Sequence, residues 1–157
     1  PPFVEVVPIV SAQDMFEAVT ERAPEQDMII KAAAVADYRP RFTSDEKIKK
    51  KDGDMSIELE RTGDILGYLG SHRTPGQLLC GFSMETSNML ENSRKKLEKK
   101  HVDMIAANNL KQQGAGFGTD TNILTLITKD TVKELPIMTK EEAANGLIDE
   151  LIKMGSK

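Results

Sequence analysis

The sequence predicts a three-layer α/β fold, with a mostly parallel β-sheet, helices on both faces and a β-hairpin near the C-terminus. Short apolar runs that are typical of buried strands alternate with capped, amphipathic helical segments. Two runs with alternating apolar and polar residues, typical of a hairpin, come late in the chain. A length of 157 residues favours one domain over residues 1–157.

The first predicted unit is a strand, a helix and a second strand. Residues 3–9 are rich in β-branched side chains, which favours a strand that ends at Pro8. Ser11 is a good N-cap for the helix that follows. Residues 27–35 are apolar and predict a buried strand at the centre of the sheet. This βαβ spacing predicts that the two strands are parallel.

A partly exposed hairpin arm is expected next. The Asp52-Gly53 pair is a turn signal between residues 47–51 and residues 55–60, and the second run alternates apolar and polar side chains. This pattern places Lys47 at the root of the arm. Thr62 is expected to cap a helix over residues 63–72.

The second half of the chain continues the alternation. Residues 77–84 predict a buried strand, followed by a helix to about Lys100 and by another parallel strand over residues 102–107. The expected hairpin pairs residues 122–128 with residues 131–138. Thr139 and Glu142 form a capping box for a last helix. That helix is expected to bury four apolar residues, namely Ala144, Leu147, Ile148 and Leu151.

Composition limits the classes of function. A net charge of −4 argues against a protein that coats nucleic acid, although clustered lysines leave local anion binding open. The single cysteine, Cys80, excludes an internal disulfide and suits a reducing cytoplasm, and its apolar neighbours predict a core thiol. No apolar run approaches the ~20 residues that span a bilayer. We expect a cytoplasmic domain that binds neither nucleic acid nor membrane.

Asp37 and Lys47 are the first candidate site residues. Asp37 follows the strand over residues 27–35, and Lys47 begins a basic cluster on the next loop. An acid at the carboxyl end of a strand, with a lysine on the following loop, is a common arrangement around ligand crevices of open α/β sheets. The small residues before Asp37 leave room for a ligand against the backbone. The alternative interpretation is a solvated loop that carries surface charges.

Lys96 and Lys100 are the second candidate pair. They lie one turn apart on the predicted helix, and they flank the face that Leu90 and Leu97 are expected to bury. Two ammonium groups that converge from one edge of a helix can hold a polyphosphate. The alternative is an ordinary exposed basic face.

Other motifs give weak signals. The glycine-rich run over residues 114–118 lacks the third glycine of a dinucleotide fingerprint, so a turn or a lid is expected there. His72 and His101 lack the spacing of metal ligands, so no metal-binding residues are assigned from the sequence. There is no Walker A motif and no nucleophile elbow.

Several spaced motifs together resemble the phosphopantothenate–cysteine ligase family. They are AAAVADYR at residues 32–39, EKIKK at 46–50, TGDI at 62–65, GFSMET at 81–86, DMIAAN at 103–108, and Phe117 with Asn122. Family members usually carry Asn-Pro where this chain has Thr62-Gly63, which leaves the choice between CTP and ATP open. The resemblance covers nearly the whole chain.

The resemblance implies a ligase that uses CTP and Mg²⁺. It joins 4′-phosphopantothenate to cysteine through an acyl-cytidylate, and it releases CMP and pyrophosphate. Lys47 would be catalytic and would stabilise charge on the acyl phosphate. The implied nucleotide-binding residues are Asp37, Lys47, Thr62, Gly63, Asp64, Ile65, Phe82, Lys96 and Lys100, and the implied substrate-binding residues are Ala33 and Ala34.

The resemblance also bears on assembly. Family members are dimeric, and residues 122–138 are the expected contact. Members begin with a glycine-rich segment, and this sequence does not contain it. In bacteria a flavin-dependent decarboxylase is often fused upstream. We therefore expect this chain to be the C-terminal nucleotide-binding part. A non-catalytic nucleotide-binding α/β domain and a nicotinamide-dependent Rossmann oxidoreductase are the alternatives.

Overall fold

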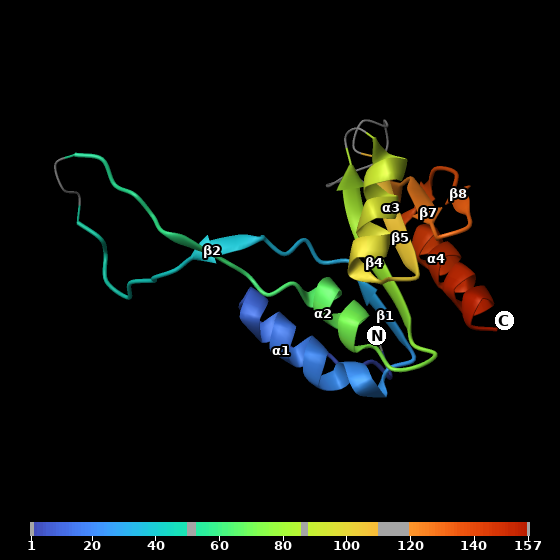
Figure 1. Ribbon diagram of the computed structural model, residues 1–157, viewed down its shortest axis with the longest axis horizontal. Coiled ribbons are helices and arrows are strands. Elements are labelled where there is room, and N and C mark those ends of the chain that lie inside the picture. Colours follow the sequence, from blue (N-terminus) through green and yellow to red (C-terminus); the bar gives the residue numbers. More distant parts are fainter. Residues whose placement is uncertain (1, 50–52, 86–87, 110–119, 157) are drawn as a thin grey trace.

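The computed structural model describes residues 2–49, 53–85, 88–109 and 120–156. Its main element is a five-stranded sheet in the order β1-β4-β5-β7-β8 (Figure 1). The first three strands in this order are parallel, and β7 and β8 run antiparallel to their neighbours. The strands are β1 (Met28–Lys31), β4 (Leu78–Glu85), β5 (Met104–Asn109), β7 (Leu124–Ile127) and β8 (Val132–Glu134).

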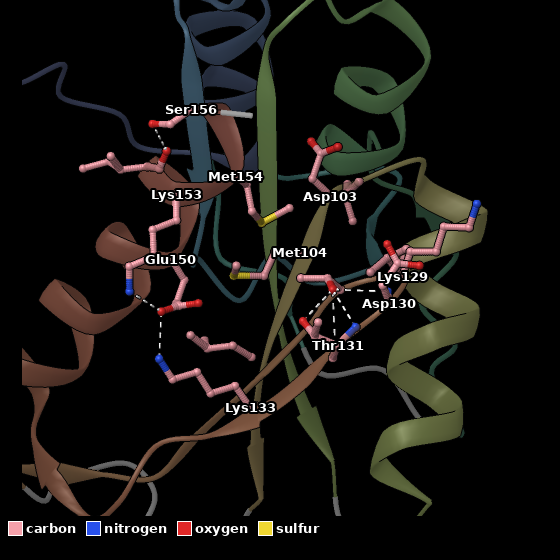
Figure 2. A pocket seen from close by; sticks show the side chains of 15 residues that line it. Asp103, Met104, Lys129, Asp130, Thr131, Lys133, Glu150, Lys153, Met154 and Ser156 are labelled. Carbon is pink, nitrogen blue, oxygen red and sulfur yellow. Dashed lines mark hydrogen bonds and ion pairs between the residues drawn. The ribbon is translucent and has the colours of Figure 1, made fainter.

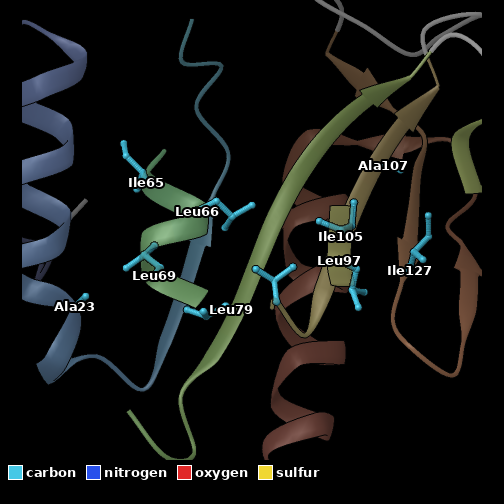
Figure 3. Packing of buried hydrophobic residues seen from close by; sticks show 10 residues of the cluster. Ala23, Ile65, Leu66, Leu69, Leu79, Leu97, Ile105, Ala107 and Ile127 are labelled. Atoms are coloured by element: carbon cyan, nitrogen blue, oxygen red, sulfur yellow. The ribbon is translucent and has the colours of Figure 1, made fainter. Parts of the chain in front are cut away.

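Helices cover both faces of this sheet, as predicted. They are α1 (Ala12–Arg22), the short 3₁₀ helix η1 (Ala23–Glu25), α2 (Ile65–His72), α3 (Met89–Lys100) and α4 (Lys140–Gly155). Alternate strand residues point to opposite faces, so each face has its own apolar cluster. Leu79, Ile105 and Ile127 pack with α1, α2 and α3 (Figure 3). Cys80, Met104 and Leu126 pack with α4 on the other face.

The late hairpin is confirmed, because β7 pairs with β8. Beside it, β6 (Thr121–Asn122) pairs with β9 (Met138–Thr139) just before α4. The Thr139–Glu142 capping box is also present. Within the described residues, none of the helices has the length and apolar character needed to cross a membrane.

The prediction of a strand over residues 3–9 is wrong. These residues form no strand, and Val6 is 75% exposed. The strand over residues 27–35 is shorter than expected, and β1 lies at the edge of the described sheet rather than at its centre. A β-branched run forms a strand only when a neighbouring strand supplies hydrogen bonds, and residues 3–9 have no such partner among the described residues.

The arm exists, but its paired base differs from the prediction. β2 (Tyr38–Pro40) pairs with β3 (Leu59–Arg61), close to the body of the protein. Beyond this base the arm projects away from the sheet and helices (Figure 1). Lys47 lies past the paired strands and is exposed, so the prediction that it sits at the root is wrong.

Three details of the helices also differ from the expectations. The N-cap of α2 is Asp64 rather than Thr62, because Thr62 uses its hydroxyl and its N–H to bind the carbonyls of Ala36 and Asp37. In α3, Leu97 is buried but Leu90 is 44% exposed. In α4, Ala143 is buried with Leu147 and Leu151, whereas Ala144 and Ile148 are exposed, so the buried stripe is shifted from the predicted one.

Candidate functional site

A cavity of about 690 Å³ opens at the carboxyl ends of β1 and β4. We call it the strand-end cavity. Its walls are the segment that leaves β1, the start of α2, the end of β4 and one side of α3. A smaller cavity of about 70 Å³ adjoins it and is lined by residues 62–66. This edge of a parallel sheet is where open α/β folds bind ligands.

The segment after β1 forms one wall. Ala33, Ala34 and Asp37 all line the strand-end cavity. Thr62 holds this segment in place, since its N–H donates to the Asp37 carbonyl at 3.0 Å and its hydroxyl donates to the Ala36 carbonyl. The small alanine side chains leave the main chain of this wall accessible.

The start of α2 forms the second wall. Thr62, Gly63, Asp64 and Ile65 all line the adjoining cavity. Gly63 is required by close packing there, because a Cβ at this position would lie 2.8 Å from the ring of Phe16. The space that the missing Cβ leaves is thus taken by the Phe16 ring, which packs α1 against this turn.

Asp64 has a defined electrostatic role at this wall. Its carboxylate accepts the Gly67 N–H at 3.0 Å as the N-cap of α2, and it forms an ion pair with Lys100. Burial opposes its ionisation, but the hydrogen bonds from Lys100 and Gly67 outweigh burial and keep the pKa of Asp64 below its ordinary value. Asp64 is therefore a carboxylate at neutral pH, and it orients Lys100.

The third wall is rich in lysine. Lys96 and Lys100 line the cavity, with Lys95 and Lys99 beside them on α3. The Lys96 ammonium donates to the Phe82 carbonyl at 2.8 Å, which holds it across the end of β4. The two lysines that the sequence singled out thus lie on the same cavity as Asp37 and Asp64.

Phe82 reaches the cavity in a way that the sequence did not indicate. Its ring packs against the apolar cluster on the α4 face of the sheet, on the side opposite α3. On the α3 side, the Phe82 carbonyl accepts a hydrogen bond from the Lys96 ammonium. The main chain of Phe82 rather than its ring is thus engaged with the lysine wall.

Lys31 is a cavity residue that sequence reasoning missed. It is the last residue of β1, lines both cavities and donates to the Ala33 carbonyl at 2.6 Å. Burial, and then the nearby charge of Lys96, lower the pKa of Lys31 below its ordinary value. A single charged residue within the apolar run of residues 28–36 was the available signal.

One predicted site residue, Lys47, does not line this site, and one predicted motif falls outside the described residues. Lys47 is absent from the described residues that line either cavity, because the exposed arm carries it away from the body. The glycine-rich run over residues 114–118 lies outside the described residues. The described part of the chain contains no group of three or more His, Cys, Asp and Glu side chains that could hold a metal ion.

A second cavity, of about 870 Å³, lies at the opposite end of the sheet (Figure 2). It combines an apolar floor that includes Met104 and Met154 with a charged rim. Its Lys133 and Lys153 both bind Glu150, at 2.7 and 2.8 Å. These hydrogen bonds lower the pKa of Glu150 to about 2. Three carboxylates, of Asp103, Asp130 and Glu150, balance the three lysines among the described residues that line this cavity, so it suits a polyanion less well than the strand-end cavity does.

Known proteins share the sequence and the fold of this chain. The coenzyme A biosynthesis bifunctional protein CoaBC of Bacillus subtilis (strain 168) is 47% identical over 148 residues, which are 94% of this chain and 36% of that protein. A crystal structure of the C-terminal domain of a CoaBC protein superposes with a TM-score of 0.78 at 45% identity, over 98% of this chain and 69% of that one.

A more distant solved structure shares the fold. A Cab2 mutant in complex with phosphopantothenate-cysteine superposes with a TM-score of 0.74 at 15% identity, over 96% of this chain and 52% of that one. Residues 1–154 match the family described as DNA/pantothenate metabolism flavoprotein C-terminal domain. The chain therefore belongs to the DNA/pantothenate metabolism flavoprotein C-terminal domain family.

Proposed function

We propose that this chain is the nucleotide-binding part of a ligase that joins 4′-phosphopantothenate to cysteine at the expense of CTP. The observation that carries the proposal is the strand-end cavity, where five lysines and two carboxylates meet at the carboxyl edge of a parallel sheet. A relative named for coenzyme A biosynthesis and a structural neighbour that holds phosphopantothenate-cysteine support it. Family membership does not favour a nicotinamide-dependent oxidoreductase or a non-catalytic binding domain.

The chemistry explains why a lysine-rich site is needed. A carboxylate is a poor acyl donor, so its oxygen first attacks the α-phosphorus of CTP, and the bond to pyrophosphate breaks. The amine of cysteine then attacks the acyl carbon of the acyl-cytidylate, loses a proton and displaces CMP. Both steps bring several negative charges close together, and cations positioned around them reduce the electrostatic repulsion.

The walls of the cavity match these steps. Lys96 and Lys100 would hold phosphate oxygens of the nucleotide, with Asp64 fixing the position of Lys100. Backbone groups of residues 62–65, together with Asp37 and the main chain of Phe82, would contact the nucleotide. Ala33 and Ala34 would leave space for the acyl substrate.

Magnesium fits this donor set as a companion of the nucleotide. Mg²⁺ commonly binds through one or two carboxylates together with substrate phosphates and water, rather than in an all-protein cage. Asp37 and Asp64 supply carboxylates on the cavity wall, and of these Asp64 already binds Lys100. Asp37 is therefore the residue that we assign to Mg²⁺. When bound, the ion neutralises phosphate charge.

Lys47 would act from the arm. Its ammonium would stabilise charge on the reacting acyl phosphate, a role that requires the arm to bring it to the cavity. We also propose that the protein works as a homodimer in the cytoplasm, with contact through residues 122–138, and that a flavin-dependent decarboxylase precedes this chain in the whole protein.

Calorimetric titration with CTP·Mg²⁺ and with ATP·Mg²⁺ tests the nucleotide site. We expect CTP to bind, and Lys96→Ala to weaken binding by about tenfold or more, as for a lost charge-assisted contact. Lys140→Ala removes the same charge from the exposed start of α4 and should leave binding unchanged. A folded chain that binds neither nucleotide, or a Lys96→Ala variant that binds as well as the wild type, would contradict the proposal.

A further inference from the structure

Lys31 is placed differently from every other lysine of the strand-end cavity. It extends from the last position of β1, a strand that is hydrogen-bonded to β4 in a register that pairs Lys31 with Gly81. Its side chain points to the same face as that of Ile29, toward α2 and α3. The other cavity lysines, at positions 95, 96, 99 and 100, come from α3. Lys31 therefore approaches the cavity from the sheet.

Among the described residues that line the cavity, positive charges outnumber negative ones. These residues include five lysines and two carboxylates, Asp37 and Asp64. Of the described ion pairs, two involve lysines of this cavity, Lys100 with Asp64 and Lys95 with Glu91, and none includes Lys31. The Lys31 ammonium donates instead to the Ala33 carbonyl at 2.6 Å, an acceptor without a full charge. Like charges held together in this way are compensated when an anion binds among them.

The form of that anion follows from the arrangement. Lys31 from the sheet and Lys96 from α3 face one cavity, and each donates to a main-chain carbonyl at its edge. A single phosphate monoester carries about two charges, whereas the triphosphate of a nucleotide carries about four and can contact both walls at once. A polyphosphate therefore matches cations on two different walls better than a single phosphate does.

We propose that Lys31 is a further phosphate-binding residue, which contacts the polyphosphate of the nucleotide from the side opposite Lys96. This inference rests on the proposed function and assigns to that site a cation that the sequence motifs did not single out. On binding, the ammonium of Lys31 exchanges the Ala33 carbonyl for a phosphate oxygen. Its position at the end of a hydrogen-bonded strand orients it before the ligand arrives.

The test compares Lys31→Met with Lys31→Arg and with Lys140→Met. Methionine keeps the length and apolar stem of the half-buried side chain and removes its charge, whereas arginine keeps the charge. Lys140→Met makes the same change at the exposed start of α4, away from the cavity. Each variant is titrated with CTP, CMP, pyrophosphate and 4′-phosphopantothenate, the first three with Mg²⁺, after circular dichroism and thermal unfolding have shown that it is folded.

We expect Lys31→Met to weaken the binding of CTP and of pyrophosphate by about tenfold or more, and to change the affinity for CMP by less than about threefold. Lys31→Arg should recover most of the loss, and Lys140→Met should match the wild type. The dependence of CTP affinity on salt should also be shallower in Lys31→Met, a change that a purely structural role would not produce.

The failures are distinguishable. If the wild type binds CTP and Lys31→Met binds CTP and pyrophosphate equally well, the inference is wrong and the proposed function stands. If Lys31→Met weakens only 4′-phosphopantothenate, Lys31 serves the monoester and the inference is wrong. If the folded wild type binds none of the nucleotides, the proposed function fails and the inference fails with it. Should Lys31→Met not fold, Lys31→Gln takes its place under the same criteria.

Discussion

Replacing Gly70 with alanine should disturb the packing of α2 against α3. A Cβ at Gly70 would lie 1.8 Å from the carbonyl oxygen of Lys100, far inside contact distance. That oxygen belongs to the main chain at the end of α3, so no side chain can rotate away to relieve the overlap. The two helices must separate, and the Asp64–Lys100 ion pair between them must adjust.

The magnitude follows from two opposing effects. Alanine favours a helix over glycine by up to about 1 kcal/mol. Groups inserted into a packed core typically destabilise a protein by about 1–3 kcal/mol. Because the overlap here is with main chain, we expect a cost at or above the upper end of that range. We therefore expect Gly70→Ala to lower the free energy of unfolding by at least about 2 kcal/mol, or the midpoint of thermal unfolding by roughly 4–8 °C for a chain of this size.

Gly146→Ala is the matched control, because it makes the same change within α4. A Cβ there would lie 3.4 Å from a Leu135 methyl group, an ordinary contact. The helix-forming gain should then dominate, and stability should rise by about 0.5–1 kcal/mol. Urea unfolding followed by circular dichroism measures both variants. A Gly70→Ala protein as stable as the wild type would show that α2 and α3 do not approach as closely as described.

Three further outcomes are expected. Lys47→Ala should lower turnover with CTP, 4′-phosphopantothenate and cysteine by about a hundredfold while CTP affinity stays within about twofold, since the proposed role of Lys47 is to stabilise charge on the reacting acyl phosphate; a loss confined to CTP affinity would refute that role. Asp64→Asn should be less stable than the wild type at neutral pH and equally stable in acid. The ionised Asp64 carboxylate stabilises the fold above its ordinary pKa of 3.8, and this stabilisation is lost as the pH falls through its lower pKa in the folded protein. Stability curves of the two proteins that run parallel from pH 7 down to about pH 2 would contradict this. Cys80 is fully buried and its pKa is raised to about 12, so a thiol reagent at pH 8 should label it only after unfolding, and rapid labelling of the native protein, seen by mass spectrometry, would show that β4 is open to solvent.

The elements with strong local signals were predictable. β4 and β5 begin with apolar runs, residues 78–82 and 104–107, that are typical of buried strands, and the capping box at Thr139 marks the start of α4. The grouping of Asp37 with Lys96 and Lys100 followed from the rule that ligands bind at the carboxyl edge of a parallel sheet, aided by the family resemblance.

The remaining features depend on tertiary contacts that local pattern does not contain. Residues 3–9 have strand propensity but no strand partner among the described residues, and β1 ends earlier than its apolar run. Asp64 rather than Thr62 caps α2, because Thr62 binds a segment some 25 residues earlier in the chain. The position of Lys31 on the cavity could not be predicted, because its neighbours in space, Lys96 and Asp64, are distant in sequence.

Hydrogen exchange with and without CTP·Mg²⁺ tests the central claim most directly, because it compares the strand-end cavity with the cavity at the opposite end of the sheet within one sample. We expect slower exchange of backbone amides in residues 32–37 and 62–67, which line the strand-end cavity and its neighbour, and no change in residues 128–133 at the opposite cavity. Protection of residues 128–133 and 150–156 instead, with none at the strand ends, would contradict the assignment of the nucleotide site.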